Sequence, residues 1–225
     1  MHKIRLLTVS FSAEMQPYEI PAFRGAVIDK VGPKHVLFHN HLEDGYRYKY
    51  PTIQYKTIQS HPAIQCINDG VDEIHRYFQQ PDWSIHIGDR KVEMKVNQLF
   101  LFNFPLEVWD KRVEYQIRDW LALSQENFLK FKQINSEIER LKMLQRILTG
   151  NILAFAKGVG WTIDKPIELS ITSTPTTKTI PHKGNHLIAF NLTFSTNVSL
   201  PNHIGLGKRV SIGYGMIKRK ERKNE

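Results

Sequence analysis

The sequence is poor in cysteine and in long apolar runs, and each shortage excludes a class of protein. Among 225 residues there is one cysteine, Cys66, so the chain alone can form neither a disulfide nor a cysteine zinc cluster. The apolar run near the N-terminus is too brief for a secretory signal, and no stretch approaches the roughly 18 apolar residues of a membrane span. We therefore expect a cytoplasmic protein without a membrane segment.

Residue patterns typical of metal sites are also scarce. The acidic residues show no pairing suited to metal ions, which disfavours a two-metal nuclease. His182 and His186 stand four residues apart, a zinc-like interval on a helix, but they flank Lys183-Gly184-Asn185. That sequence predicts a hairpin turn, where helical spacing loses its meaning. We expect no metal and no cofactor.

Positive charge is what the sequence has in excess. Lys and Arg number 31 against 22 Asp and Glu, for a net charge of +9, and such an excess attracts polyanions, nucleic acid first among them. Residues 205–225 contain seven basic and two acidic residues, so this stretch holds +5 of the total. The basic C-terminal end therefore indicates a nucleic-acid contact, with a solvated tail as the alternative.

The first ninety residues alternate between patterns typical of strands and of helices. Apolar residues predict strands at 3–11, 46–59 (one bent strand or a pair), 61–68 and 83–88, and helices at 23–32 and 69–80, the latter capped by Asp69. The order β-α-β-β-α-β is that of a ferredoxin-like domain covered by helices on one face. We place the domain boundary near Arg90, giving an N-terminal domain at 1–90 and a C-terminal domain at 91–225.

The second half opens with extended segments and ends in strands. Extended chain is expected at 94–108 and 112–123, helices at 124–134 and 136–160, and strands within 161–174, 186–200 and 209–218. The longer helix has a Ser136 cap, and its internal Gly150 predicts a kink or break. This half fits a ferredoxin-like order more loosely than the first.

A glycine-rich segment, GLGKRVSIGYG, lies near the C-terminus. Its glycines at 205, 207, 213 and 215 surround Lys208 and Arg209, a combination that lets backbone N–H groups and cations approach a phosphate. It opens no helix and lacks P-loop spacing, so it is not a nucleotide fingerprint of either common type. The alternative is a glycine-rich hairpin packed tightly on its own helix.

The same segment carries a family resemblance. GLGKRVSIGYG resembles the glycine-rich signature of the RAMP superfamily, and specifically of CRISPR repeat-processing endoribonucleases. FRGAVIDKVG followed by HVLFHNHLEDGYRYKYPTIQYK is similar to the N-terminal half of that family. The resemblance implies an α+β fold of two tandem ferredoxin-like (RRM-like) domains, with RNA held across the pair and by the glycine-rich loop.

The resemblance also implies a reaction: metal-independent cleavage of precursor RNA within its repeats, by attack of a 2′-hydroxyl, leaving a 2′,3′-cyclic phosphate and a 5′-hydroxyl. The family's catalytic histidine lies in the segment that here holds His35, His39 and His41. Histidine titrates near neutrality and can move the protons without a metal. We rank His41 and His39 equally and His35 below them.

Other roles in the site follow from residues near these histidines. Lys49 is expected to stabilise charge on the phosphorane and Tyr46 to orient the phosphate, with Lys30, Lys34 and Lys56 as alternatives to Lys49. The expected RNA-binding residues are Arg47, Lys56, Gly205, Gly207, Lys208, Arg209, Gly213 and Gly215.

Two other functions remain open. A catalytically inactive RAMP-type RNA-binding subunit would keep the basic face and use its histidines structurally, and a DNA-binding protein or RNA chaperone would be unrelated to CRISPR. The expected partner is CRISPR repeat RNA, as precursor of guide RNA, and the hypothesis admits other Cas effector subunits and a second copy of the chain as further partners.

Overall fold

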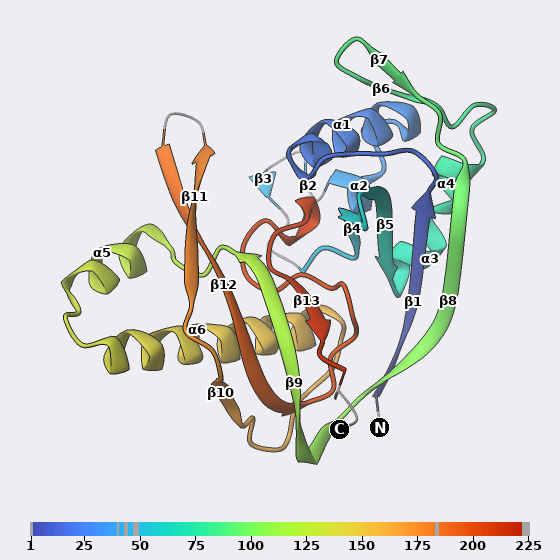
Figure 1. Cartoon of the computed structure of the whole chain (residues 1–225). Helices are drawn as coiled ribbons and strands as arrows, with labels where there is room; N and C mark the ends of the chain where they lie inside the picture. The colour runs from blue at the N-terminus through green and yellow to red at the C-terminus, as the bar shows by residue number, and fades with distance from the viewer. Residues whose placement is uncertain (1, 40, 43–44, 47–49, 183–184, 222–225) are drawn as a thin grey trace. The chain divides into compact units, whose positions relative to one another are not determined.

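The computed structural model of the protein describes residues 2–39, 41–42, 45–46, 50–182 and 185–221 (Figure 1). The chain divides into two compact units. The first consists of Lys3–Pro105 together with Ser211–Gly213, and the second of Leu106–Val210 and the chain from Tyr214, together with His2. The division thus falls after Pro105, further along the chain than the boundary expected near Arg90.

The first unit is built on a four-stranded sheet in the order β4-β5-β1-β8. With its helices it forms the βαββαβ pattern of a ferredoxin-like domain. Its main elements are β1 (His2–Phe11), η1 (Pro17–Glu19), α1 (Ile20–Val31), α2 (Val36–His39), β4 (Ile53–Ile58), β5 (His61–Ile67), α3 (Asp69–Glu73), α4 (His75–Phe78) and β8 (Val96–Leu106). The strands predicted at 3–11 and 61–68 and the helix predicted at 23–32 are confirmed.

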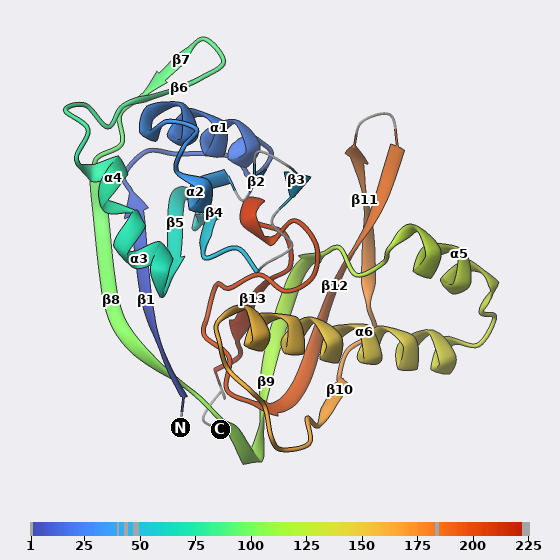
Figure 2. The same ribbon diagram turned by 180° about the vertical axis from the view of Figure 1, so that it is seen from behind.

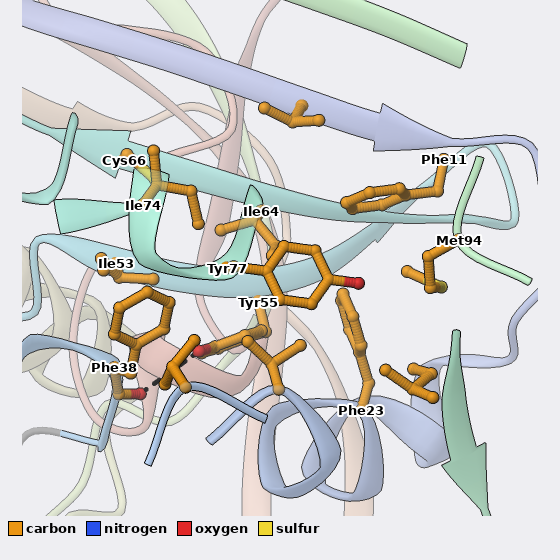
Figure 3. Packing of buried hydrophobic residues seen from close by; sticks show 14 of the residues in the cluster. Phe11, Phe23, Phe38, Ile53, Tyr55, Ile64, Cys66, Ile74, Tyr77 and Met94 are labelled. Carbon is orange, nitrogen blue, oxygen red and sulfur yellow. Dashed lines mark hydrogen bonds between the residues drawn. The ribbon is translucent and has the colours of Figure 1, made fainter. Parts of the chain in front are cut away.

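One face of this sheet and the helices enclose an aromatic core (Figure 3). Phe23 of α1 meets Tyr55 of β4 edge to face, with 5.4 Å between ring centroids, and Phe11 meets Tyr77 in the same way at 6.2 Å. The hydroxyl of Tyr55 donates to the carbonyl oxygen of Phe38, 3.4 Å away, which is the dashed contact in Figure 3. This bond and the burial of Phe38 fix α2, the helix that precedes the candidate catalytic segment.

Two predictions for the first unit are wrong in detail. The segment 83–88 does not supply the fourth strand of the sheet: Ile85–Ile87 (β6) turns back at Gly88, which has a φ of +57°, and pairs with Arg90–Val92 (β7) in a separate hairpin. The fourth strand is β8. Asp69 is the first residue of α3 rather than its cap, because the chain enters the helix through Asn68 at a φ of +47°.

The second unit repeats the ferredoxin-like strand order with one helix replaced. Its sheet runs β10-β12-β9-β13, and β11 extends the same edge by pairing with β12. Between β12 and β13, where a second helix is expected, the chain instead forms the glycine-rich segment with the short helix η2. The elements are β9 (Val108–Trp120), α5 (Gln125–Gln133), α6 (Glu137–Gly158), β10 (Leu169–Ile171), β11 (Thr176–His182), β12 (Asn185–Val198), η2 (Val210–Ile212) and β13 (Met216–Arg219).

Helix α6 lies along this sheet, as Figure 2 shows. It begins at the predicted cap, where the Ser136 hydroxyl accepts from the amide of Glu139, and buries Leu148, Ile152 and Phe155. The helix is continuous through Gly150, so the break considered there as an alternative to a kink is absent, because packing on both sides of the glycine holds the helical path. No helix among the described residues is long and apolar enough to cross a membrane.

One further strand prediction for this half needs correction, and one strand was missed. Residues 209–218 do not form one strand: positive φ angles at Arg209, Gly213 and Gly215 bend the chain, and only β13 is extended. The strand β11 was not predicted. The hairpin between His182 and His186 is confirmed, since His182 pairs with Asn185 in the register of β11 and β12.

Candidate functional site

The candidate catalytic segment follows α2 and contains a small hairpin, His41–Leu42 (β2) paired with Gly45–Tyr46 (β3). In the register of this hairpin His41 lies directly opposite Tyr46. The backbone thus brings together two residues that the sequence assigned to catalysis; Arg47 and Lys49 lie outside the described residues.

His39 is the last residue of α2, and its ring takes part in local structure. Its Nε2–H donates to the carbonyl oxygen of Pro33 at 2.6 Å, because a carbonyl can only accept. Its own carbonyl accepts a hydrogen bond from the Arg24 guanidinium. His39 and His41 therefore belong to different elements, and His39 has one ring nitrogen engaged in fixing the turn before α2.

The ring of His35 has two contacts within the protein. Its Nδ1 lies 2.6 Å from Oε1 of Glu73 on α3, and its ring meets Phe38 edge to face at 6.4 Å. These contacts anchor the start of α2 to α3, so His35 has a structural explanation that needs no substrate.

The lysines considered as charge-stabilising residues have different surroundings. Lys30 donates to the carbonyl oxygen of Asp82 at 2.7 Å, and Lys34 is exposed in the turn between α1 and α2. Lys56 is 1% exposed, and its ammonium group donates to the amide oxygens of Gln54 at 3.0 Å and Gln65 at 3.1 Å. Burial lowers the pKa of Lys56 to about 7. This position away from the surface argues against the expected contact of Lys56 with RNA.

The glycines of the glycine-rich segment are explained by close packing within the protein. A Cβ on Gly215, whose φ is +65°, would lie 1.9 Å from the carbonyl oxygen of Leu206, and a Cβ on Gly207 would lie 2.7 Å from Nε1 of Trp120. Gly205 and Gly215 are buried, and the Gly215 amide donates to the Asp119 carbonyl oxygen at 3.1 Å. For Gly205 and Gly215 the structure therefore argues against direct contact with a phosphate.

The remaining glycines and cations of the segment are more accessible. Gly207 and Gly213 are half-buried, Arg209 is half-buried at a φ of +56°, and Lys208 is exposed. Lys208, Arg209 and His186 of β12 line one pocket of about 520 Å³, whose apolar wall comes from the β9–α5 connection, α5 and β12. Partial burial, followed by the neighbouring charge of Arg209, lowers the pKa of Lys208.

A basic groove lies on the sheet of the second unit, and the sequence predicted only part of it. It is about 780 Å³ in volume and is lined by Lys111, Arg112, Val113, Glu114, Thr172, Ser195, Asn202, Lys218, Arg219, Lys220 and Glu221. Within β9, Arg112 and Glu114 of the groove alternate with the buried Val113, Tyr115 and Ile117, so these two side chains lie on the sheet face opposite the core. The sequence indicated the C-terminal cations but not those of β9.

Contacts with neighbouring side chains hold the cations of the groove in place. Lys111 and Arg219 lie over the ring of Trp109, 5.8 and 5.9 Å from its centroid. Lys220 pairs with Glu114 at 3.0 Å, and this contact holds the pKa of the Glu114 carboxyl below its usual value. Five cations against two carboxylates leave the groove positively charged, as a polyanion site requires. Within the described residues no three His, Cys, Asp or Glu side chains form a metal-binding group.

Both halves of the chain match family models. Residues 2–103 match the Cas6b N-terminal domain and residues 107–220 the Cas6b C-terminal domain. A curated relative, an uncharacterized protein of Methanocaldococcus jannaschii, is 30% identical over 115 residues, which are 51% of this chain and 77% of the relative.

Solved structures show the same similarity over the whole chain. A crystal structure of Cas6b matches with a TM-score of 0.90 and 25% identity, over 97% of this chain and all of the other. A crystal structure of the CRISPR RNA processing endoribonuclease Cas6b matches with a TM-score of 0.74 and 24% identity, over 97% of this chain and all of the other. The two-domain fold expected from the sequence is thereby confirmed.

Proposed function

Because the chain belongs to the Cas6b family of RAMP-type repeat-processing endoribonucleases, we propose that it cleaves CRISPR precursor RNA within the repeats, without a metal, to give guide RNAs. The observation that carries the proposal is the match of both halves to Cas6b domains, at residues 2–103 and 107–220. The cytoplasmic location stays a prediction.

The proposed chemistry needs one proton acceptor and one proton donor. The 2′-oxygen attacks the adjacent phosphorus while the bond from phosphorus to the 5′-oxygen breaks, so the 2′-hydroxyl loses a proton and the leaving 5′-oxygen gains one. The products are a 2′,3′-cyclic phosphate and a 5′-hydroxyl. A histidine can serve either transfer near neutral pH.

We assign this acid–base role to His41 ahead of His39. His39 already donates one ring N–H to Pro33, and His35 is paired with Glu73, so both have structural explanations. His41 stands opposite Tyr46 in the hairpin, which supports Tyr46 as the residue that orients the phosphate. Lys49 remains the proposed source of positive charge for the phosphorane.

The basic groove of the second unit is proposed as part of the RNA path. Its cations would hold the sugar-phosphate backbone. Lys208 and Arg209, beside their own pocket, are proposed as a second backbone contact.

The experiment that tests the function uses a labelled repeat RNA from the same genome, incubated with the purified protein in EDTA. A companion RNA carries a single 2′-deoxy substitution at the cut. We expect one cut in EDTA, abolished by the deoxy substitution, with a 2′,3′-cyclic phosphate on the 5′ fragment. Tight binding without a cut, with or without added divalent metal, would instead identify an inactive RNA-binding subunit.

A further inference from the structure

The pocket beside the glycine-rich segment combines an apolar wall with two cations. Its volume of about 520 Å³ falls within the range of small-ligand pockets, about 300–1,000 Å³. Leu121 and Phe128 contribute to the wall from the β9–α5 connection and from α5, and Leu187 contributes from β12. Lys208 and Arg209 line the same pocket, and among the described residues no carboxylate does. The lining therefore suits a ligand with an apolar part and a negative charge.

Arg209 has a backbone conformation that glycine adopts more readily. Its φ of +56° is left-handed, which costs free energy for a residue with a Cβ atom and none for glycine. Glycine does occupy such positions nearby, at Gly207 with a φ of +95° and at Gly213 with a φ of +87°. The half-buried guanidinium of Arg209 has no hydrogen-bond or ion-pair partner among the described residues. An arginine kept at a glycine-like position with unpaired donors indicates a ligand.

The chemistry of the lining matches one nucleotide of a single strand. Lys208 and Arg209 are adjacent cations, so an anion between them relieves the repulsion of their like charges. Phosphate is such an anion, and it matches the paired donors of a guanidinium. The apolar wall accepts the flat face of a base, because bases stack on aromatic side chains. Bases of an RNA stem are paired and stacked on each other, so only an unpaired nucleotide can turn its base into a pocket.

We propose that this pocket holds one unpaired nucleotide of the repeat RNA, with its base against Phe128 and its phosphate on Lys208 and Arg209. The inference rests on the proposed function, because it takes repeat RNA as the ligand. It goes further by naming a site that selects a base in a single-stranded part of the repeat. His186, which also lines the pocket, can form a hydrogen bond with the edge of that base.

Removal of single bases from the RNA tests the base contact. The repeat RNA carries a 2′-deoxy substitution at the cut, so that binding is measured without cleavage, and each companion RNA lacks one base. We expect the wild type to bind at least one of these abasic RNAs about 10-fold more weakly, the contribution of one stacked base. For Phe128→Ala that abasic RNA should bind as well as the intact RNA, because the contact is already lost. Leu153→Ala, at an exposed apolar residue of α6, should respond like the wild type.

The variant Arg209→Gly tests the phosphate contact. It should weaken binding about 10-fold and reduce the salt dependence of the log affinity by about 0.7, the value for one phosphate of a single strand. Because glycine relieves the left-handed backbone, the urea unfolding midpoint should stay equal or rise. The control Gln59→Gly, at an exposed residue with a φ of +52° in the β4–β5 turn, should affect stability in the same way and leave RNA affinity unchanged. A lower midpoint with unaltered affinity would show that Arg209 has only a structural role.

The outcomes separate this pocket from the proposed cleavage. Equal responses of the wild type and Phe128→Ala to every missing base overturn the proposal, even if Arg209→Gly weakens binding, because the contact is then with the RNA backbone alone. Cleavage of unmodified repeat RNA by the wild type would stand in that case. If the wild type shows the expected base dependence but cuts no repeat RNA, the pocket is supported and the proposed cleavage fails. A wild type with no affinity for repeat RNA overturns both.

Discussion

Raising the pH from about 7.5 to about 9 should stabilise the folded protein through Lys56. Burial lowers the pKa of this lysine from 10.5 to about 7, so above neutral pH the folded protein holds the side chain uncharged while the unfolded chain keeps it protonated. Unfolding then takes up a proton. The free-energy cost of burying Lys56, relative to the charged side chain in the unfolded protein, is fully present below pH 7. It decreases as the pH rises towards 10.5.

The size of the effect follows from the two pKa values. Each pKa unit corresponds to about 1.4 kcal/mol, so between about pH 7.5 and pH 9 the free energy of unfolding should rise by about 2 kcal/mol. The pH range over which stability rises ends near pH 9, because burial also raises the pKa of the Cys66 thiol. Above the thiol's ordinary pKa the unfolded chain loses that proton, which offsets the further gain from Lys56, so the free energy of unfolding levels off.

Urea unfolding of the wild type and of Lys56→Met at both pH values provides the assay. The variant keeps the length of the side chain without its charge, so its stability should change about 2 kcal/mol less than that of the wild type over the interval. Lys165→Met, at an exposed lysine, should follow the wild type. If the wild type and Lys56→Met respond equally to pH, Lys56 is charged in the folded protein and the reasoning is refuted.

Three further predictions concern packing and the RNA path. Gly215→Ala should cost at least about 2 kcal/mol in urea unfolding, since its Cβ would collide with a backbone carbonyl; an unchanged midpoint would contradict the packing. Lys111→Gln combined with Lys218→Gln should weaken repeat-RNA binding and reduce the salt dependence of its log affinity by about 1 to 2, whereas an unaltered slope would place the RNA elsewhere. Tyr77→Phe should lose about 1 kcal/mol with the bond that its hydroxyl donates to Trp83, 2.7 Å away, and no loss would show that bond to be unimportant.

The sequence predicted local structure well where a single element determines it. The cap Ser136 and the apolar stripe of α6 depend on residues a few positions apart, and this helix begins directly after the predicted cap. The segment 83–88 was misplaced because a strand of a separate hairpin and a strand of the main sheet share the same short apolar pattern. Only pairing between distant strands distinguishes them, and that pairing made β8 the fourth strand.

The candidate site, too, could be predicted only in part from the sequence. Histidines and tyrosines at 35–46 could be chosen from residue types and resemblance, but their ranking needed the bond from His39 to Pro33 and the register of β2 with β3. Lys56 was expected at a surface because lysine is seldom buried. Its burial beside Gln54 and Gln65 could not be predicted from alternation along β4, because Ile53–Lys56 are buried on both faces of this strand.

The most direct test of the proposed catalysis compares single-turnover cleavage of repeat RNA in EDTA by the wild type, His41→Ala and His39→Ala, with RNA affinity measured on the same samples. We predict that His41→Ala lowers the cleavage rate by about 100-fold or more while its affinity for RNA stays close to that of the wild type. His39→Ala should cleave faster than His41→Ala. A His41→Ala protein that cuts at the wild-type rate would contradict the assignment of His41 and return the acid–base role to another residue.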